Sequence, residues 1–84
     1  MQFVKEGVRV KEGTIVKSLK GHDEGRVYAV IATSGNDFVL LCDGKYRKLD
    51  NPKQKRVKHL EVLCETEFPS ELNDKKLREI CKNR

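Results

Sequence analysis

The residues best suited to chemistry are cations gathered in one short stretch. Positions 45–59 hold seven lysines and arginines against one acid, Asp50, so this stretch carries +6 of a whole-chain charge of +5, and the remainder carries −1. Lysine and arginine neutralise phosphates and release condensed counterions, which gives affinity for a nucleic acid whatever its base sequence. The stretch therefore predicts a surface for a polyanionic partner. The alternative is a merely solvated face, although such faces usually intersperse both signs.

Two flat side chains, Tyr46 and His59, lie inside this stretch, and flat groups stack on unpaired bases. The alternatives are that Tyr46 is a core or rim aromatic and that His59 is an edge-strand residue without a special role. Further polar groups flank a loop with glycines at both ends, which Asp23 is expected to order by capping local amides. The candidate binding residues are Lys20, His22, Arg26, Lys45, Tyr46, Arg47, Lys53, Lys55, Arg56, Lys58 and His59.

The remaining reactive side chains are poorly placed for catalysis or metal binding. Cys42, Cys64 and Cys81 are widely spaced, odd in number and without a C-x-x-C pair, which argues against a disulfide framework or a zinc site. Nothing near them resembles a nucleophile turn or an oxyanion nest. We therefore expect a binding protein and not an enzyme, with no cofactor, no metal and no small-molecule substrate.

The length of 84 residues fits one small domain. The longest apolar run, at 38–42, has five residues, far short of the roughly 20 that span a membrane. The first residues mix charges with valines and lack the continuous apolar region of a secretory signal. We expect a cytoplasmic protein, a monomer when free, with no membrane partner.

The elements that must position these residues are mostly strands. Over 13–67, β-branched and aliphatic residues are cut at short intervals by turn residues, which predicts a small all-β domain. The segment at 26–33 is apolar on both faces and is therefore expected to be central. Asp43-Gly44 favours a hairpin turn, which would place a polar fourth strand at an edge and Lys53 and Lys55 on the loop that follows it. The expected strands are 14–19, 26–33, 38–42, 45–49 and 56–63, enough for a small barrel.

The two ends of the chain differ from this pattern. Residues 1–12 alternate weakly and are expected to be an edge strand or a loose arm. Within 70–84, Asn73 is a good helix N-cap, and Leu77, Ile80 and Cys81 form a narrow apolar stripe, which predicts a short helix packed on or beside the barrel. Charged residues one turn apart are expected to pair, Asp74 with Arg78 and Lys75 with Glu79. A partner-binding or RNA-binding helix is the alternative.

The segment from Gly13 to Val30 carries a family resemblance: an apolar strand, a loop with glycines at positions 21 and 25, and a second apolar strand. It resembles a KOW motif. The likeness continues through 37–44, Arg47 and 51–60, and the series is similar to short bacterial KOW-domain RNA-binding proteins related to a large-subunit ribosomal protein family of archaea and eukaryotes. It covers roughly three fifths of the chain. The family pattern often has arginine where this chain has His22.

This resemblance implies an SH3-like barrel that binds structured RNA, in particular ribosomal RNA of the large subunit. KOW barrels also occur in transcription and translation factors. The alternative function is therefore a protein-interaction module of that machinery, with the basic stretch meeting an acidic protein surface.

Overall fold

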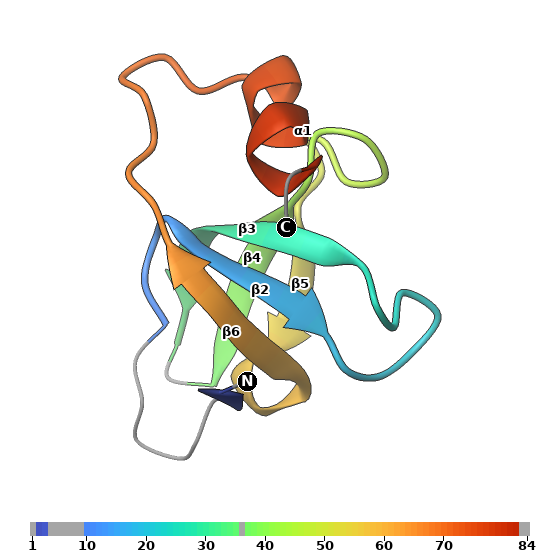
Figure 1. Ribbon diagram of the computed structural model, residues 1–84. Coiled ribbons are helices and arrows are strands. Elements are labelled where there is room, and N and C mark those ends of the chain that lie inside the picture. Colours follow the sequence, from blue (N-terminus) through green and yellow to red (C-terminus); the bar gives the residue numbers. More distant parts are fainter. Residues whose placement is uncertain (1, 4–9, 36, 83–84) are drawn as a thin grey trace.

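The computed structural model describes residues 2–3, 10–35 and 37–82. Its strands form one antiparallel sheet in the order β1-β6-β2-β3-β4-β5. The strands cross one another at an angle, so the sheet is coiled into a small barrel-like fold with a helix at one end (Figure 1). The expected mainly β fold with one C-terminal helix is confirmed. The elements are β1 (Gln2–Phe3), β2 (Thr14–Ser18), β3 (Val27–Ser34), β4 (Phe38–Cys42), β5 (Lys53–Arg56), a 3-10 helix η1 (Val57–His59), β6 (Leu60–Glu65) and α1 (Asp74–Lys82).

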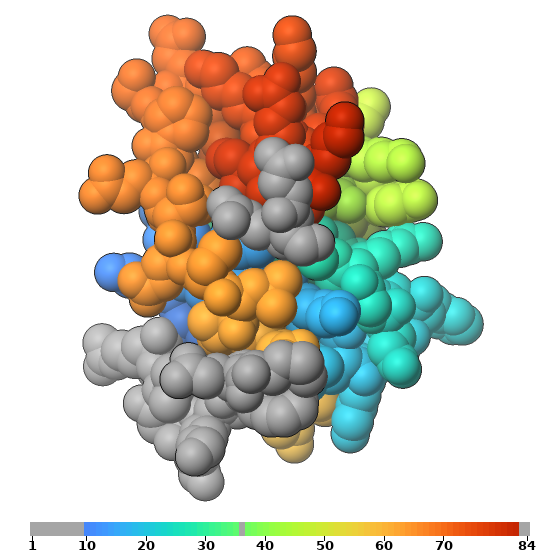
Figure 2. All heavy atoms as spheres, viewed as in Figure 1, coloured from blue at the N-terminus to red at the C-terminus, as the bar shows by residue number. Residues whose placement is uncertain are grey.

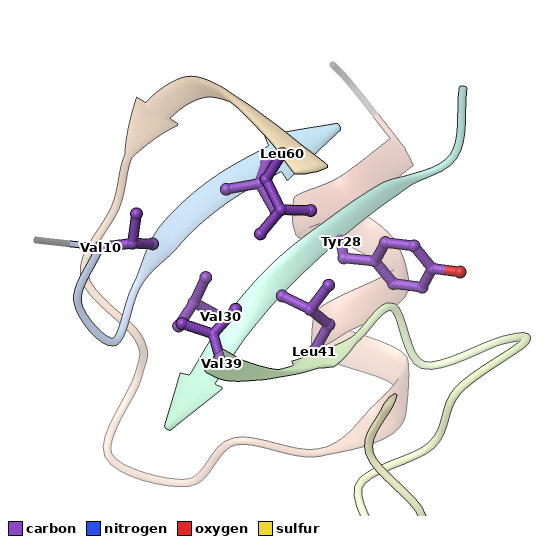
Figure 3. Close-up of a cluster of buried hydrophobic side chains, with 7 residues drawn as sticks. Val10, Tyr28, Val30, Val39, Leu41 and Leu60 are labelled. Carbon is purple, nitrogen blue, oxygen red and sulfur yellow. The ribbon is translucent and has the colours of Figure 1, made fainter. Parts of the chain in front are cut away.

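β3 lies inside the sheet between β2 and β4, as its two apolar faces predict. Tyr28 and Val30 point into a core inside the curved sheet, whereas Ala29 points to the opposite face. Because side chains alternate along a strand, this one segment contributes to two separate hydrophobic layers. The interior layer consists of Val10, Val16, Tyr28, Val30, Val39, Leu41 and Leu60, all at most 5% exposed (Figure 3).

The second layer joins the sheet to α1. Leu77 is fully buried against Ile15, Ala29 and Cys42, and Leu72 packs on the same cluster. The Asn73 side-chain oxygen accepts a hydrogen bond from the Lys76 N–H at 2.9 Å, which satisfies a free amide of the first turn. The predicted cap and apolar stripe are therefore confirmed, and they fix α1 across one face of the sheet.

The predicted strand at 45–49 is wrong. Asp43 Oδ1 accepts hydrogen bonds from the Lys45 and Arg47 N–H groups, both at 2.9 Å, so those amides are not available to a strand ladder. The edge position belongs instead to β5, which pairs with β4 from Leu41↔Lys53 to Phe38↔Arg56. The predicted strand at 56–63 is also shifted, because η1 separates β5 from β6.

For residues 1–12 an edge strand or a loose arm is expected. Gln2–Phe3 form β1, which pairs with β6, and residues 1 and 4–9 lie outside the described residues. No helix in the described ranges is long and apolar enough to cross a membrane.

Candidate nucleic-acid interface

A buried ion-pair cluster lies beneath the loop that joins β2 to β3. The Asp23 carboxylate is 3% exposed at its side chain and lies 2.6 Å from Lys55 Nζ and 3.1 Å from Lys53 Nζ. Ser18 Oγ, 2.8 Å from Asp23 Oδ1, accepts a hydrogen bond from Lys55, and the Tyr28 hydroxyl donates to Asp23 Oδ2 at 3.0 Å. We call these five residues the Asp23 cluster. In Figure 3 the Tyr28 ring belongs to the interior core, and its hydroxyl points away from the other labelled side chains.

The cluster holds Asp23 in its charged form. Burial by itself would raise the pKa of this carboxyl, but hydrogen bonds from Lys55, Ser18 and the other neighbours outweigh it and hold the pKa well below its usual range. Lys55 Nζ also donates to the Lys20 carbonyl oxygen at 2.6 Å, so one ammonium group ties β5 to the loop. The ion pair between Asp23 and Lys55 therefore fixes the loop at 19–26 to β5.

This arrangement corrects three sequence-based expectations. Lys53 and Lys55 belong to strand β5 and not to a loop, and both ammonium groups pair with Asp23, Lys53 from a half-buried position and Lys55 from a buried one. Lys55 is 9% exposed and is therefore removed from the candidate binding surface. The sequence predicts that Asp23 caps local amides. Its carboxylate instead binds the side chains of Ser18, Tyr28 and Lys55.

The cations that remain exposed around the loop form the first basic region. β5 alternates, so Arg56 faces solvent while Lys55 is buried, and the Arg56 guanidinium lies over the Phe38 ring at 5.1 Å. The Leu19 N–H donates to the His59 carbonyl oxygen at 2.9 Å, which brings η1 against the loop. We call this region the rim surface, and it consists of the cations Lys20, Arg56 and Lys58 together with His22 and His59.

His59 lies among the cations of the rim surface. The residue is half-buried, and its pKa is lowered first by desolvation and then by the positive charges of Lys20, Lys58, Lys55 and Arg56. Within the described residues, the ion pairs are Lys11–Glu65, Lys53–Asp23 and Lys55–Asp23, so none neutralises an exposed cation of the rim surface. The rim surface is thus a concentrated positive patch.

The second basic region is carried by the segment 43–49, which α1 holds in place. The Leu49 N–H donates to Asp74 Oδ1 at 2.8 Å, and the Arg78 guanidinium donates to the Gly44 carbonyl oxygen at 2.8 Å. Asp74 and Arg78 thus bind this loop, whereas the sequence predicts that they pair with each other. Figure 2 shows the red atoms of α1 beside the yellow-green atoms of the loop.

Tyr46 projects from this loop and is 55% exposed, so the alternative of a core aromatic is wrong. The Arg26 guanidinium carbon lies 3.8 Å from the centre of its ring, and Lys45 Nζ lies 5.1 Å from it. These are cation–π contacts, which hold flat groups in a stack. Lys45 is exposed beside the ring. Arg47 is half-buried, and its backbone N–H and carbonyl oxygen form hydrogen bonds within the 43–47 turn.

Between this loop and α1 lies an open groove of about 720 Å³. Three cations of α1, at helical spacings of three and four residues, line it: Lys75, Arg78 and Lys82. The sequence does not single out these three residues, because neighbouring acids in the chain nearly balance their charge. The spacing on one helix face was the available signal, but the loop opposite could not be inferred from it. The structure therefore divides the predicted single patch into two regions.

The thiols and carboxylates show no metal-binding arrangement in the part of the chain that is described. Burial, followed by the nearby Asp74 and Asp43 carboxylates, raises the pKa of the Cys42 thiol to about 11. Since the thiolate is the reactive form, the raised pKa makes Cys42 a poor nucleophile, and its side chain packs in the hydrophobic core.

No family model and no curated protein matches this chain. The two basic regions must therefore be interpreted from their own geometry.

Proposed function

We propose that this protein is a cytoplasmic RNA-binding protein of the KOW type that binds structured ribosomal RNA through the rim surface. The observation that carries the proposal is the gathering of three exposed cations, Lys20, Arg56 and Lys58, around His59, with no ion-pair partner for any of them among the described residues. A protein surface with such a potential attracts phosphates, and neutralising them releases condensed counterions.

The loop at 19–26 suits this role because its shape is already fixed. Asp23 and Lys55 hold it from beneath, so little conformational entropy is lost when a partner binds. Its exposed cations are spread over a curved rim, which matches recognition by phosphate positions and RNA shape. The charges at Lys20, Arg56 and Lys58 come from separate segments and face solvent together.

The test measures the affinity for ribosomal RNA as a function of salt concentration. The double variant Arg56→Gln, Lys58→Gln removes two charges of the rim surface. The matched control, Lys11→Gln with Lys76→Gln, removes two charges that lie away from the rim surface, one on an exposed and one on a half-buried residue. Each lost phosphate contact reduces the log-log slope by about 0.7 to 0.9. We expect the rim variant to reduce the slope by about 1.5 and the control to leave it unchanged.

Equal slopes for the wild-type protein and the rim variant would overturn this assignment. A protein complex that survives nuclease treatment, together with RNA binding only at low salt, would favour the protein-interaction function instead.

A further inference from the structure

The open groove between α1 and the segment 43–49 has the features of a separate ligand site. Its volume of about 720 Å³ lies within the range of roughly 300 to 1,000 Å³ typical of small-ligand pockets. Its walls come from the start of β3, the 43–49 loop and α1, three segments fixed by Leu77 packing and by the two loop-to-helix hydrogen bonds. We call it the Tyr46 groove.

The lining of the Tyr46 groove is strongly cationic. Its five basic residues face two acids, Asp43 and Glu79. The Asp43 carboxylate is buried, and its Oδ1 already accepts two backbone N–H groups, so the cations outnumber the one acid left on the surface of the groove. The basic lining residues are Arg26, Lys45, Lys75, Arg78 and Lys82.

The groove also presents a large stacking surface. Tyr46 is the more exposed of the two large hydrophobic side chains left open to solvent among the described residues, and the Arg26 guanidinium lies 3.8 Å from its ring centre. Nucleic-acid bases stack both on aromatic rings and on guanidinium planes. An exposed ring also costs free energy of hydration unless a partner covers it.

We propose that the Tyr46 groove binds one unpaired nucleotide of the RNA, with its base stacked on the Tyr46–Arg26 pair and its phosphate near the lysines of α1. The proposal rests on the RNA-binding function proposed above. A paired base is already stacked within its duplex, so the groove selects a bulge, a loop or a strand end. The rim surface then supplies affinity for phosphates, and the groove supplies preference for an unpaired position.

The experiment compares two blunt-ended RNA hairpins with the same stem, each closed by a non-nucleotide linker so that the loop offers no unpaired base. One is fully paired, and the other carries a single bulged 2-aminopurine. Binding is measured by fluorescence anisotropy, and stacking by quenching of the 2-aminopurine. Stacking contributes about 1 to 3 kcal/mol per base. We therefore expect Tyr46→Ala to weaken binding of the bulged hairpin about tenfold, to abolish the quenching and to leave the paired hairpin unaffected. Tyr46→Phe, which keeps the ring, should restore both signals.

Because Tyr46 is exposed, its replacement should not unfold the protein, and circular dichroism checks this. Salt-dependent binding of both hairpins that is insensitive to Tyr46 would overturn the groove assignment and leave the proposed function standing. Absence of salt-dependent binding to either hairpin would overturn both. Tyr46-dependent binding of an acidic peptide in place of RNA would assign the groove to a protein partner and overturn the proposal.

Discussion

The rim surface and the Tyr46 groove are both positively charged, but different interactions stabilise them. Beneath the rim surface, a carboxylate that is 3% exposed binds two lysines that reach it from β5. The groove depends instead on apolar packing of Leu77 and on two hydrogen bonds that join α1 to the 43–49 loop. Buried charge therefore organises one region, and a docked helix organises the other. The two should fail under different perturbations.

The largest effect is expected from Asp23→Asn. Removing one member of a buried pair leaves an uncompensated buried charge, which costs about 3 to 5 kcal/mol. We expect the free energy of unfolding to fall by about 3 kcal/mol in a denaturant titration, with hydrogen exchange at 19–26 accelerated more than at 43–49. Glu24→Gln, an exposed neighbour in the same loop, is the control and should change little. Equal acceleration in both loops would break the comparison.

The same carboxylate predicts an acid limit for stability. Because the pKa of Asp23 is lower in the folded protein than its ordinary value of 3.8, its contribution is present above about pH 4 and is lost as pH falls through the lowered pKa. In Asp23→Asn this part of the acid dependence should be missing.

Gly44→Ala should produce the next largest effect. It should destabilise the 43–49 loop and α1, which form the Tyr46 groove. Gly44 has φ +79°, and an added Cβ would collide with the backbone carbonyl of Asp74 at the start of α1. We expect a loss of about 2 kcal/mol, from left-handed strain and from displacement of the helix. Gly25→Ala has a similar φ of +90° but open space around the Cβ, so it should lose only about 1 kcal/mol. Thermal unfolding of the two variants measures the difference, and equal losses would show that α1 does not constrain the loop.

A comparable effect, confined to alkaline pH, is expected from Tyr28. Burial and then its hydrogen bond to Asp23 raise the pKa of this phenol to about 12 from an ordinary value of 10.0. A raised pKa means that the neutral form stabilises the fold, so its contribution is complete below pH 10 and is lost as pH rises through about 12. We expect wild-type stability to decline in this window by about 2 kcal/mol more than that of Tyr28→Phe. Parallel declines would remove Tyr28 from the Asp23 cluster.

Local signals were sufficient to predict most of the scaffold. The two apolar faces of 26–33 predicted a central strand, the turn residues before 38 predicted the β3–β4 hairpin, and Asn73 with Leu77 predicted the docked helix. Each of these features depends on residues close together in the chain. The sequence pattern therefore held enough information to place them.

The errors concern contacts between distant residues. The alternation in 45–49 is typical of a strand, but Asp43 and α1 take the amides that a ladder would need. Likewise, nothing in the composition near Lys55 indicates burial, because its carboxylate partner is 32 residues away. Charge counting along the sequence treats every lysine as solvent-facing and so joined two regions that the fold separates.

The long separation between Asp23 and Lys55 also sets an order of events during protein synthesis. The β2–β3–β4 meander, made first, contains the 19–26 loop but neither of the lysines that hold Asp23. A nascent chain that ends before β5 therefore lacks the clamp that fixes the loop. The rim surface reaches its final shape only when β5 joins the sheet, so the RNA binding that we propose for it should emerge late in translation, once β5 has been made.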